Sequence, residues 1–132
     1  MNNLAHRNKM EALEDSILHS GAMVELECKH YFAHGTYTRE LFIPKHTILT
    51  GRIHLHSTIN IISRGKIRVI TDDGEHDIEA PHTFVSGPMV KKAGFTLEDT
   101  IWLNVFPWDG SEEPEMAIEL LTVPTYSMLE AK

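Results

Sequence analysis

Apolar and polar residues alternate in short runs along most of the chain, and residues typical of turns separate the runs. From about residue 22 onward these runs predict strands at 23–28, 39–43, 49–55, 59–62, 66–71, 75–78, 83–85, 93–96, 100–106 and 116–123. Asp73-Gly74 predicts a hairpin turn, because Gly tolerates the positive φ that tight hairpin turns need. Short strands at this regular spacing predict a β-sandwich, a jelly roll or a small barrel.

The beginning of the chain has a different pattern, in which apolar residues recur at helical spacing with charged residues between them. The helix predicted over residues 3–19 ends before Ser20-Gly21 and carries the apolar residues Leu4, Met10, Leu13, Ile17 and Leu18. We therefore expect an N-terminal helix in residues 1–21 and one β-barrel domain in residues 22–132.

The segment between Gly51 and Gly65 contains the strongest candidate for a functional site. If it is a strand, its side chains alternate between two faces, and one face carries His54, His56, Thr58, Asn60 and Ile62. Two imidazoles on one face can converge on a metal ion, or they can act as a pair of proton-transfer groups. The alternative is a polar strand face in contact with solvent.

The order of these motifs resembles the cupin superfamily over residues 36–107, and the resemblance rests on His54-x-His56, Gly65, Asp73-Gly74, Ala80-Pro81 and Ser86-Gly87-Pro88. It implies an antiparallel jelly-roll barrel with a divalent metal held by three His and one Glu at its mouth. The chain is also similar to small uncharacterised cupin-type proteins of phages and prophages, and this resemblance brings no assigned activity with it. That second resemblance rests on Tyr37–Glu40, Lys91-Lys92 and Glu98–Trp102.

The chain carries only part of the ligand set that the resemblance implies. His54 and His56 match the first motif, but the place of its Glu falls on Thr58 or Asn60, which supply no negative charge. No His follows Gly87-Pro88, where the second motif would place one. Two imidazoles are fewer than the three or four protein ligands of a stable metal centre, so we expect at most a weakly held Fe, Mn, Ni or Zn.

Residues outside this segment are candidates for the pocket wall. In the strand predicted at 100–106, Trp102, Asn104 and Phe106 share one face, which either lines a pocket or fills the core. His34 and Tyr37 lie around the start of another predicted strand, and His34 is a candidate third imidazole or acid–base group.

Two lysines replace the second-motif His in this part of the sequence. Lys91 and Lys92 are ordinarily solvated, but one of them can point into the barrel mouth. A lysine there repels a metal cation and attracts an anion, so a small anionic ligand is as plausible an occupant as a metal.

Composition restricts the kinds of partner. With 12 basic and 19 acidic residues the net charge is −7, which disfavours binding to nucleic acid or to an anionic membrane surface. The single Cys28 and the lack of a long apolar run lead us to expect a cytoplasmic protein without a membrane span. Because small barrels expose sheet edges, we also expect a homodimer.

Three functions remain open on the sequence alone. The first is a small-molecule-binding cupin-type protein with a degenerate metal site around His54 and His56. The second is a divalent-metal-dependent enzyme of the dioxygenase, isomerase or lyase type, and the third is a structural or assembly protein with a vestigial pocket. The missing ligands argue against the second function, while Lys91 and Lys92 favour the first.

Overall fold

The computed structural model describes residues 4–5, 7–10, 12–13, 26–71 and 73–123. Its strands are β1 (Glu27–Ala33), β2 (Thr36–Ile43), β3 (Ile48–Thr50), β4 (Ile53–His54), β5 (Thr58–Arg64), β6 (Lys66–Thr71), β7 (Gly74–Glu79), β8 (His82–Ser86), β9 (Ala93–Thr96), β10 (Thr100–Pro107) and β11 (Thr122–Val123). The helix α2 (Pro114–Leu121) lies between β10 and β11. The described residues between 4 and 13 are also helical, as predicted, while residues 14–19 of the predicted helix lie outside the described residues.

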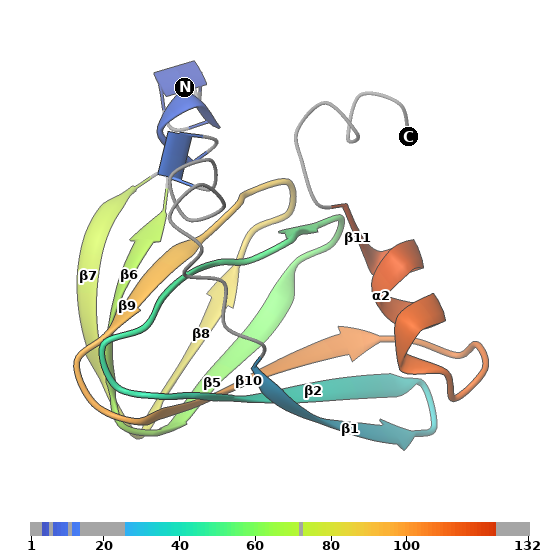
Figure 1. Ribbon diagram of the computed structural model, residues 1–132. Coiled ribbons are helices and arrows are strands. Elements are labelled where there is room, and N and C mark those ends of the chain that lie inside the picture. The colour runs from blue at the N-terminus through green and yellow to red at the C-terminus, as the bar shows by residue number, and fades with distance from the viewer. Residues whose placement is uncertain (1–3, 6, 11, 14–25, 72, 124–132) are drawn as a thin grey trace.

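The strands form two main sheets that face each other (Figure 1). One sheet has the strand order β1-β2-β10-β5-β8, the other has the order β3-β9-β6-β7, and β4 pairs separately with β11. Every described pairing is antiparallel. No ladder joins the two main sheets within the described part of the chain, so the jelly roll is open along its sides. The predicted all-β jelly-roll class is thus confirmed.

The core between the sheets follows from strand alternation, which places every second side chain inside. Ile43, Ile62, Ile67, Val69 and Trp102 form its largest buried cluster. The inward faces also carry polar groups, because Thr58, Asn60 and Asn104 are buried on β5 and β10. Buried polar groups on an otherwise apolar face require partners, and they mark the region where the site lies.

The predicted hairpin at Asp73-Gly74 is confirmed, since it joins β6 to β7 and Gly74 has a φ of 115°. A second hairpin, between β1 and β2, was not predicted. There β1 runs on to Ala33, and Gly35 adopts a φ of 71° in the turn. His34 is therefore exposed at the tip of a hairpin.

The strand predicted at 116–123 is wrong for most of its length, because residues 114–121 form the helix α2 and only residues 122–123 lie in a strand, β11. Pro114 stands in the first turn, where its missing N–H and fixed φ suit a helix start. The buried residues Ala117 and Leu121 are four apart and share one helix face. They pack against Tyr37 and Phe106, at the end of the jelly roll where β2 and β10 approach α2 (Figure 1).

No helix among the described residues combines the length and the apolar character that a membrane span requires.

Candidate functional site

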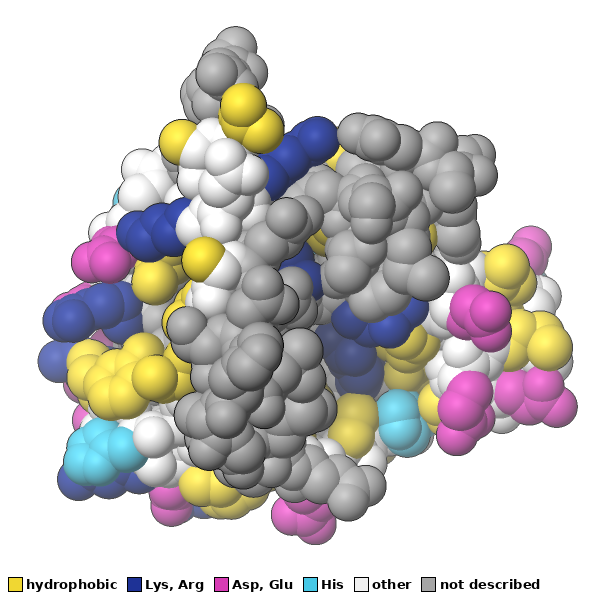
Figure 2. All heavy atoms as spheres, turned by 45° about the horizontal axis from the view of Figure 1, so that its top comes forward, with side chains coloured by type: hydrophobic (Ala, Val, Ile, Leu, Met, Phe, Trp, Pro, Cys, Tyr) yellow, Lys and Arg dark blue, Asp and Glu magenta, His cyan; other side chains and the backbone are white. Residues whose placement is uncertain are grey.

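Residues from both sheets and from β4 line a small cavity, which we call the cationic cavity. Its volume is about 40 Å³, enough for a group of only a few atoms. Figure 2 shows Lys and Arg side chains in a hollow near the centre of the face that it views. Among the described residues, the cavity lining includes three cations and no carboxylate: Arg39, Leu41, Leu49, Gly51, Arg52, His54, Lys92, Ala93, Gly94, Trp102 and Asn104.

A hydrogen-bond network centred on Asn60 supports this cavity. The Asn60 Oδ1 accepts hydrogen bonds from Trp102 Nε1 at 3.1 Å and from Asn104 Nδ2 at 2.7 Å. The Asn60 Nδ2 donates to the Thr58 carbonyl oxygen at 3.1 Å and to Ser86 Oγ at 3.0 Å. Because both acceptor sites and both donors of the amide are in use, Asn60 fixes its neighbours and has no atom left for a ligand.

Arg39 brings a largely buried guanidinium to the cavity from β2. Its Nη2 donates to Asn104 Oδ1 at 3.4 Å, while its Nε is buried and has no hydrogen-bond partner in the described structure. Burial lowers the pKa of Arg39, but an arginine remains protonated at neutral pH. A buried charge with an unused donor is costly unless a partner binds to it, so Arg39 is the strongest indication of an anion site.

Lys92 lies just before β9 and is only 6% exposed. Its Nζ donates to Ser86 Oγ at 3.2 Å, and the described residues give it no carboxylate partner. Burial, and then the nearby charge of Arg39, lower the pKa of Lys92 to about 8. At pH 7 most Lys92 side chains are therefore still charged, and an anion would hold them so.

Arg52 precedes β4 and completes the cationic set. Its Nε donates to Thr122 Oγ1 at 2.6 Å, which ties it to the start of β11. Burial, followed by repulsion from Arg39, lowers the pKa of Arg52, while the charge of Glu119 acts in the opposite direction. Two guanidiniums near one cavity repel each other, and an anion placed between them would relieve this repulsion.

His54 is a neutral imidazole in this environment. It is 4% exposed, and its ring lies edge-on to Phe106 at a centroid distance of 5.1 Å. Burial, then the charges of Lys92 and Arg39, lower the pKa of His54 to about 3. Thr58 Oγ1 donates to the His56 carbonyl oxygen, so the 3.0 Å contact between His54 Nδ1 and Thr58 Oγ1 uses the Nδ1 proton. The Nε2 lone pair is then the remaining acceptor of His54.

His56 does not lie beside His54, contrary to the expectation from strand alternation. The strand β4 ends at His54 and the chain bends before β5 begins at Thr58, so His56 is exposed. The described residues contain no group of three or more His, Cys, Asp or Glu side chains that could hold a metal ion. The groups around His54 are the cations Arg39 and Lys92 and the amide of Asn60, whose hydrogen-bonding atoms are all in use. This set does not fit a divalent metal.

The remaining predicted pocket residues divide into two groups. Lys92, Trp102 and Asn104 line the cationic cavity, while Thr58 and Asn60 support it from behind. Residues of the second group are not part of the cavity lining, and they are His34, Tyr37, Lys91 and Phe106.

The residues of the second group have other surroundings. Tyr37 and Phe106 stack beneath α2, and the Tyr37 hydroxyl lies 2.7 Å from His30 Nδ1. Burial raises the pKa of Tyr37 to about 12, so the hydroxyl stays neutral. Lys91 is fully buried next to Lys92, and His34 is exposed in its hairpin.

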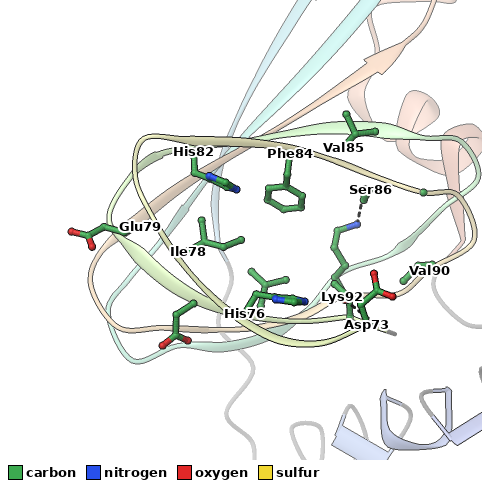
Figure 3. A pocket seen from close by; sticks show the side chains of 14 residues that line it. Asp73, His76, Ile78, Glu79, His82, Phe84, Val85, Ser86, Val90 and Lys92 are labelled. Atoms are coloured by element: carbon green, nitrogen blue, oxygen red, sulfur yellow. Dashed lines mark hydrogen bonds between the residues drawn. The ribbon is translucent and has the colours of Figure 1, made fainter.

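Lys92 also lines a second, larger hollow, which we call the outer pocket. Its volume is about 420 Å³, and it lies between β7 and β8, where the two sheets are not joined. Figure 3 shows Phe84, Ile78 and His76 pointing into it together with Lys92, whereas Glu79 points away. Among the described residues, only Lys92 lines both hollows.

Sequence reasoning missed Arg39 and Arg52. The pattern along β2 contained a usable indication, because Arg39 alternates with Tyr37, Leu41 and Ile43 on one strand face. An arginine in such an apolar series is a candidate for a buried charge. Arg52 lies in a segment without regular alternation, and no comparable pattern identifies it.

No family model and no curated protein sequence matches the chain. Several solved structures do match the chain. KdgF from Halomonas sp. is 16% identical, with a TM-score of 0.57 over 71% of this chain and 87% of that chain. An RmlC-like cupin from Shewanella frigidimarina is 18% identical, with a TM-score of 0.55 over 74% of this chain and 92% of that chain.

A cupin superfamily protein from Desulfitobacterium hafniense has a TM-score of 0.55 at 10% identity, over 64% of this chain and 79% of that chain. The chain has the cupin fold. At these identities the similarity concerns the fold alone, and the chemistry of the site must be argued from its own residues.

Proposed function

We propose that this cupin-type protein binds a small anionic molecule, whose charged group enters the cationic cavity. The observation that carries the proposal is the unpaired buried Nε of Arg39, in a cavity lined also by Arg52 and Lys92 and by no described carboxylate. A carboxylate or a phosphate supplies both the missing acceptor and the missing negative charge. The chain as a whole is acidic, so this local cationic set is not a consequence of composition.

The same residues argue against the metal-dependent alternative. A metal ion next to His54 would stand close to Arg39 and Lys92, whose charges already lower the pKa of that imidazole. Asn60, which stands at one of the two candidate places of the motif's Glu, already accepts hydrogen bonds from Trp102 and Asn104 at its amide oxygen. We therefore treat His54 as a hydrogen-bonding group for the anion rather than as a metal ligand.

Thermal unfolding tests the proposal, with phosphate and acetate titrated against chloride at constant ionic strength. An anion at ten times its dissociation constant stabilises the fold by about 1.4 kcal/mol. For a chain of this size that raises Tm by about 5 °C. We expect this rise in the unmodified protein. Its absence with both anions contradicts the proposal and favours a structural protein with a vestigial pocket.

Two variants with the same change in charge localise the effect. Arg39→Met removes a buried charge, so it should leave the ligand-free Tm unchanged or higher while abolishing the response to anions. Arg64→Gln removes an exposed charge on β5 and should keep the full response. A response that survives in Arg39→Met would show that the anion binds elsewhere.

A further inference from the structure

Lys92 lines both the cationic cavity and the outer pocket. In Figure 3 its side chain extends into the outer pocket, and a dashed line joins its amine to Ser86. The small cavity has room for little more than a carboxylate, whereas the outer pocket accommodates a larger group. A ligand whose charged group contacts Arg39 would therefore place its neighbouring atoms next to the amine of Lys92.

We infer that Lys92 forms a reversible imine with the carbonyl carbon of a small 2-oxo carboxylate. The inference rests on the proposed anion site and names the class of its ligand. In a 2-oxo acid the carbonyl carbon is bonded directly to the carboxylate, which matches a small cavity whose lining includes Arg39, Arg52 and Lys92 together. The apolar side chains of Ile78 and Phe84 in the outer pocket suit the remainder of such a molecule.

The surroundings of Lys92 favour a nucleophilic amine. It is buried, it makes no ion pair with a described residue, and its hydrogen-bond partner is a hydroxyl. The charge of Arg39 further lowers the pKa of Lys92, to about 8, so about one amine in ten is neutral at pH 7. Amines activated in this way by burial and a neighbouring cation are the usual nucleophiles toward carbonyl groups.

The step is balanced without a further reactant. The neutral amine of Lys92 adds to the carbonyl carbon, and the carbonyl oxygen then leaves as water with the two amine hydrogens. A carbon–nitrogen double bond replaces the carbon–oxygen double bond, and no oxidation occurs. Ser86 Oγ, 3.2 Å from the amine, is placed to pass protons between nitrogen and oxygen. The reverse reaction with water releases the ligand.

The pH dependence follows from the groups around the amine. The cationic cavity presents Arg39, Arg52 and neutral His54, and the titratable groups of the outer pocket are Asp73, His76, Asp77, Glu79 and His82. None of those five groups contributes to the shift of the Lys92 pKa, which burial and Arg39 produce. The rate of imine formation should therefore rise with pH. It should level off only above about 8, because the bound carboxylate raises the pKa of Lys92 above its value in the ligand-free chain.

Reductive trapping tests the inference on the full chain. The protein is incubated with pyruvate and sodium cyanoborohydride, which reduces an imine to a stable secondary amine, and peptide mass spectrometry locates the adduct. We expect one adduct per chain, on Lys92, and at least a tenfold lower yield in Lys92→Arg, which retains the charge but is too basic to react. Lys91→Arg is the matched control and should keep the yield.

Lactate separates this inference from the proposed function, because it carries the carboxylate without the carbonyl group. If lactate raises Tm but pyruvate leaves no adduct on Lys92, the anion site stands and the imine is wrong. If neither acid raises Tm and no adduct forms, both proposals fail. An adduct spread over exposed lysines, with an unchanged yield in Lys92→Arg, also overturns the imine.

Discussion

At the scale of single residues, the molecule has charged side chains at buried positions where apolar side chains would give a more stable fold. Arg39 lies on the same strand face as Tyr37 and Ile43, both fully buried. Burial of a charge without a full set of partners typically costs more than the interaction returns. Such groups persist where binding or chemistry requires them, and we read Arg39 and Lys92 in this way.

His54 makes stability depend on pH in a predictable direction. Its pKa is about 3 in the folded chain, against 6.5 for an ordinary histidine, so between these values only the unfolded chain takes up the proton. The free energy of unfolding should therefore fall as the pH drops from 6.5 toward 3. The loss is about 1.4 kcal/mol for each pH unit, or at most about 3 kcal/mol by pH 4.

Urea unfolding at pH 7 and pH 4, in chloride buffers, measures this effect. His54→Asn keeps a polar group near Thr58 but cannot titrate, and it should remove most of the difference between the two pH values. His56→Asn is the matched control, because His56 is exposed, and it should leave the difference unchanged. An equal pH dependence in His54→Asn and the unmodified chain would contradict the assignment.

At the scale of elements, short structural breaks decide which side chains reach the site. The two-residue strand β4 pairs with β11 through His54 and Thr122, and the chain then bends away from that ladder. This bend separates His54 from His56. The pairing also depends on α2, which delivers β11 to β4 and places Thr122 within hydrogen-bonding distance of Arg52. The helix is thus part of the support of the cationic cavity.

Two adjacent leucines in α2 provide a test of how the helix packs on the jelly roll. Leu121 is 6% exposed and packs on Tyr37 and Phe106, whereas Leu120 is 55% exposed. Leu121→Ala should lower the free energy of unfolding by about 2–4 kcal/mol, through lost burial and the cavity it leaves. Leu120→Ala should change it by less than about 0.5 kcal/mol. Equal effects in chemical denaturation would contradict the packing of Leu121 on Tyr37 and Phe106.

At the scale of the whole molecule, the open jelly roll leaves sheet edges and one apolar outer surface. The strands β1 and β8 end one sheet, and β3 and β7 end the other. On the outside of β5, β8 and β10, cross-strand neighbours form an apolar patch: Ile59, Ile61, Val85, Leu103 and Val105. Exposed edges and apolar patches of this kind are commonly covered by a second chain.

The homodimer expected from the sequence stays a prediction, and light scattering at micromolar concentration tests it. We expect a dimer in the unmodified chain and a monomer in Val85→Glu, because Val85 is the most exposed member of the patch, at 69%. The change Leu120→Glu adds the same charge on α2, outside the patch, and should leave the dimer intact. A monomeric unmodified chain would show that the patch has no partner copy.

The sequence by itself determined those strands and turns that depend only on residues close to one another along the chain. The observed bounds of β6 and β9 coincide with the predicted segments 66–71 and 93–96, and the Asp73-Gly74 turn lies where Gly was needed. Alternation also placed Trp102 and Asn104 on one face of β10. These features were predictable because turn geometry and strand alternation are set by the residue itself and those beside it.

The tertiary structure alone decided the contents of the site. Arg39 meets Asn104 across 65 positions of sequence, and Asn60 meets Trp102 across 42. The interior position of Arg39 follows from the pairing of β2 with β10 and from the facing sheet, neither of which its own segment specifies. The charge of a site and the pKa of its groups depend on such distant contacts and on the water they exclude, and local sequence contains neither.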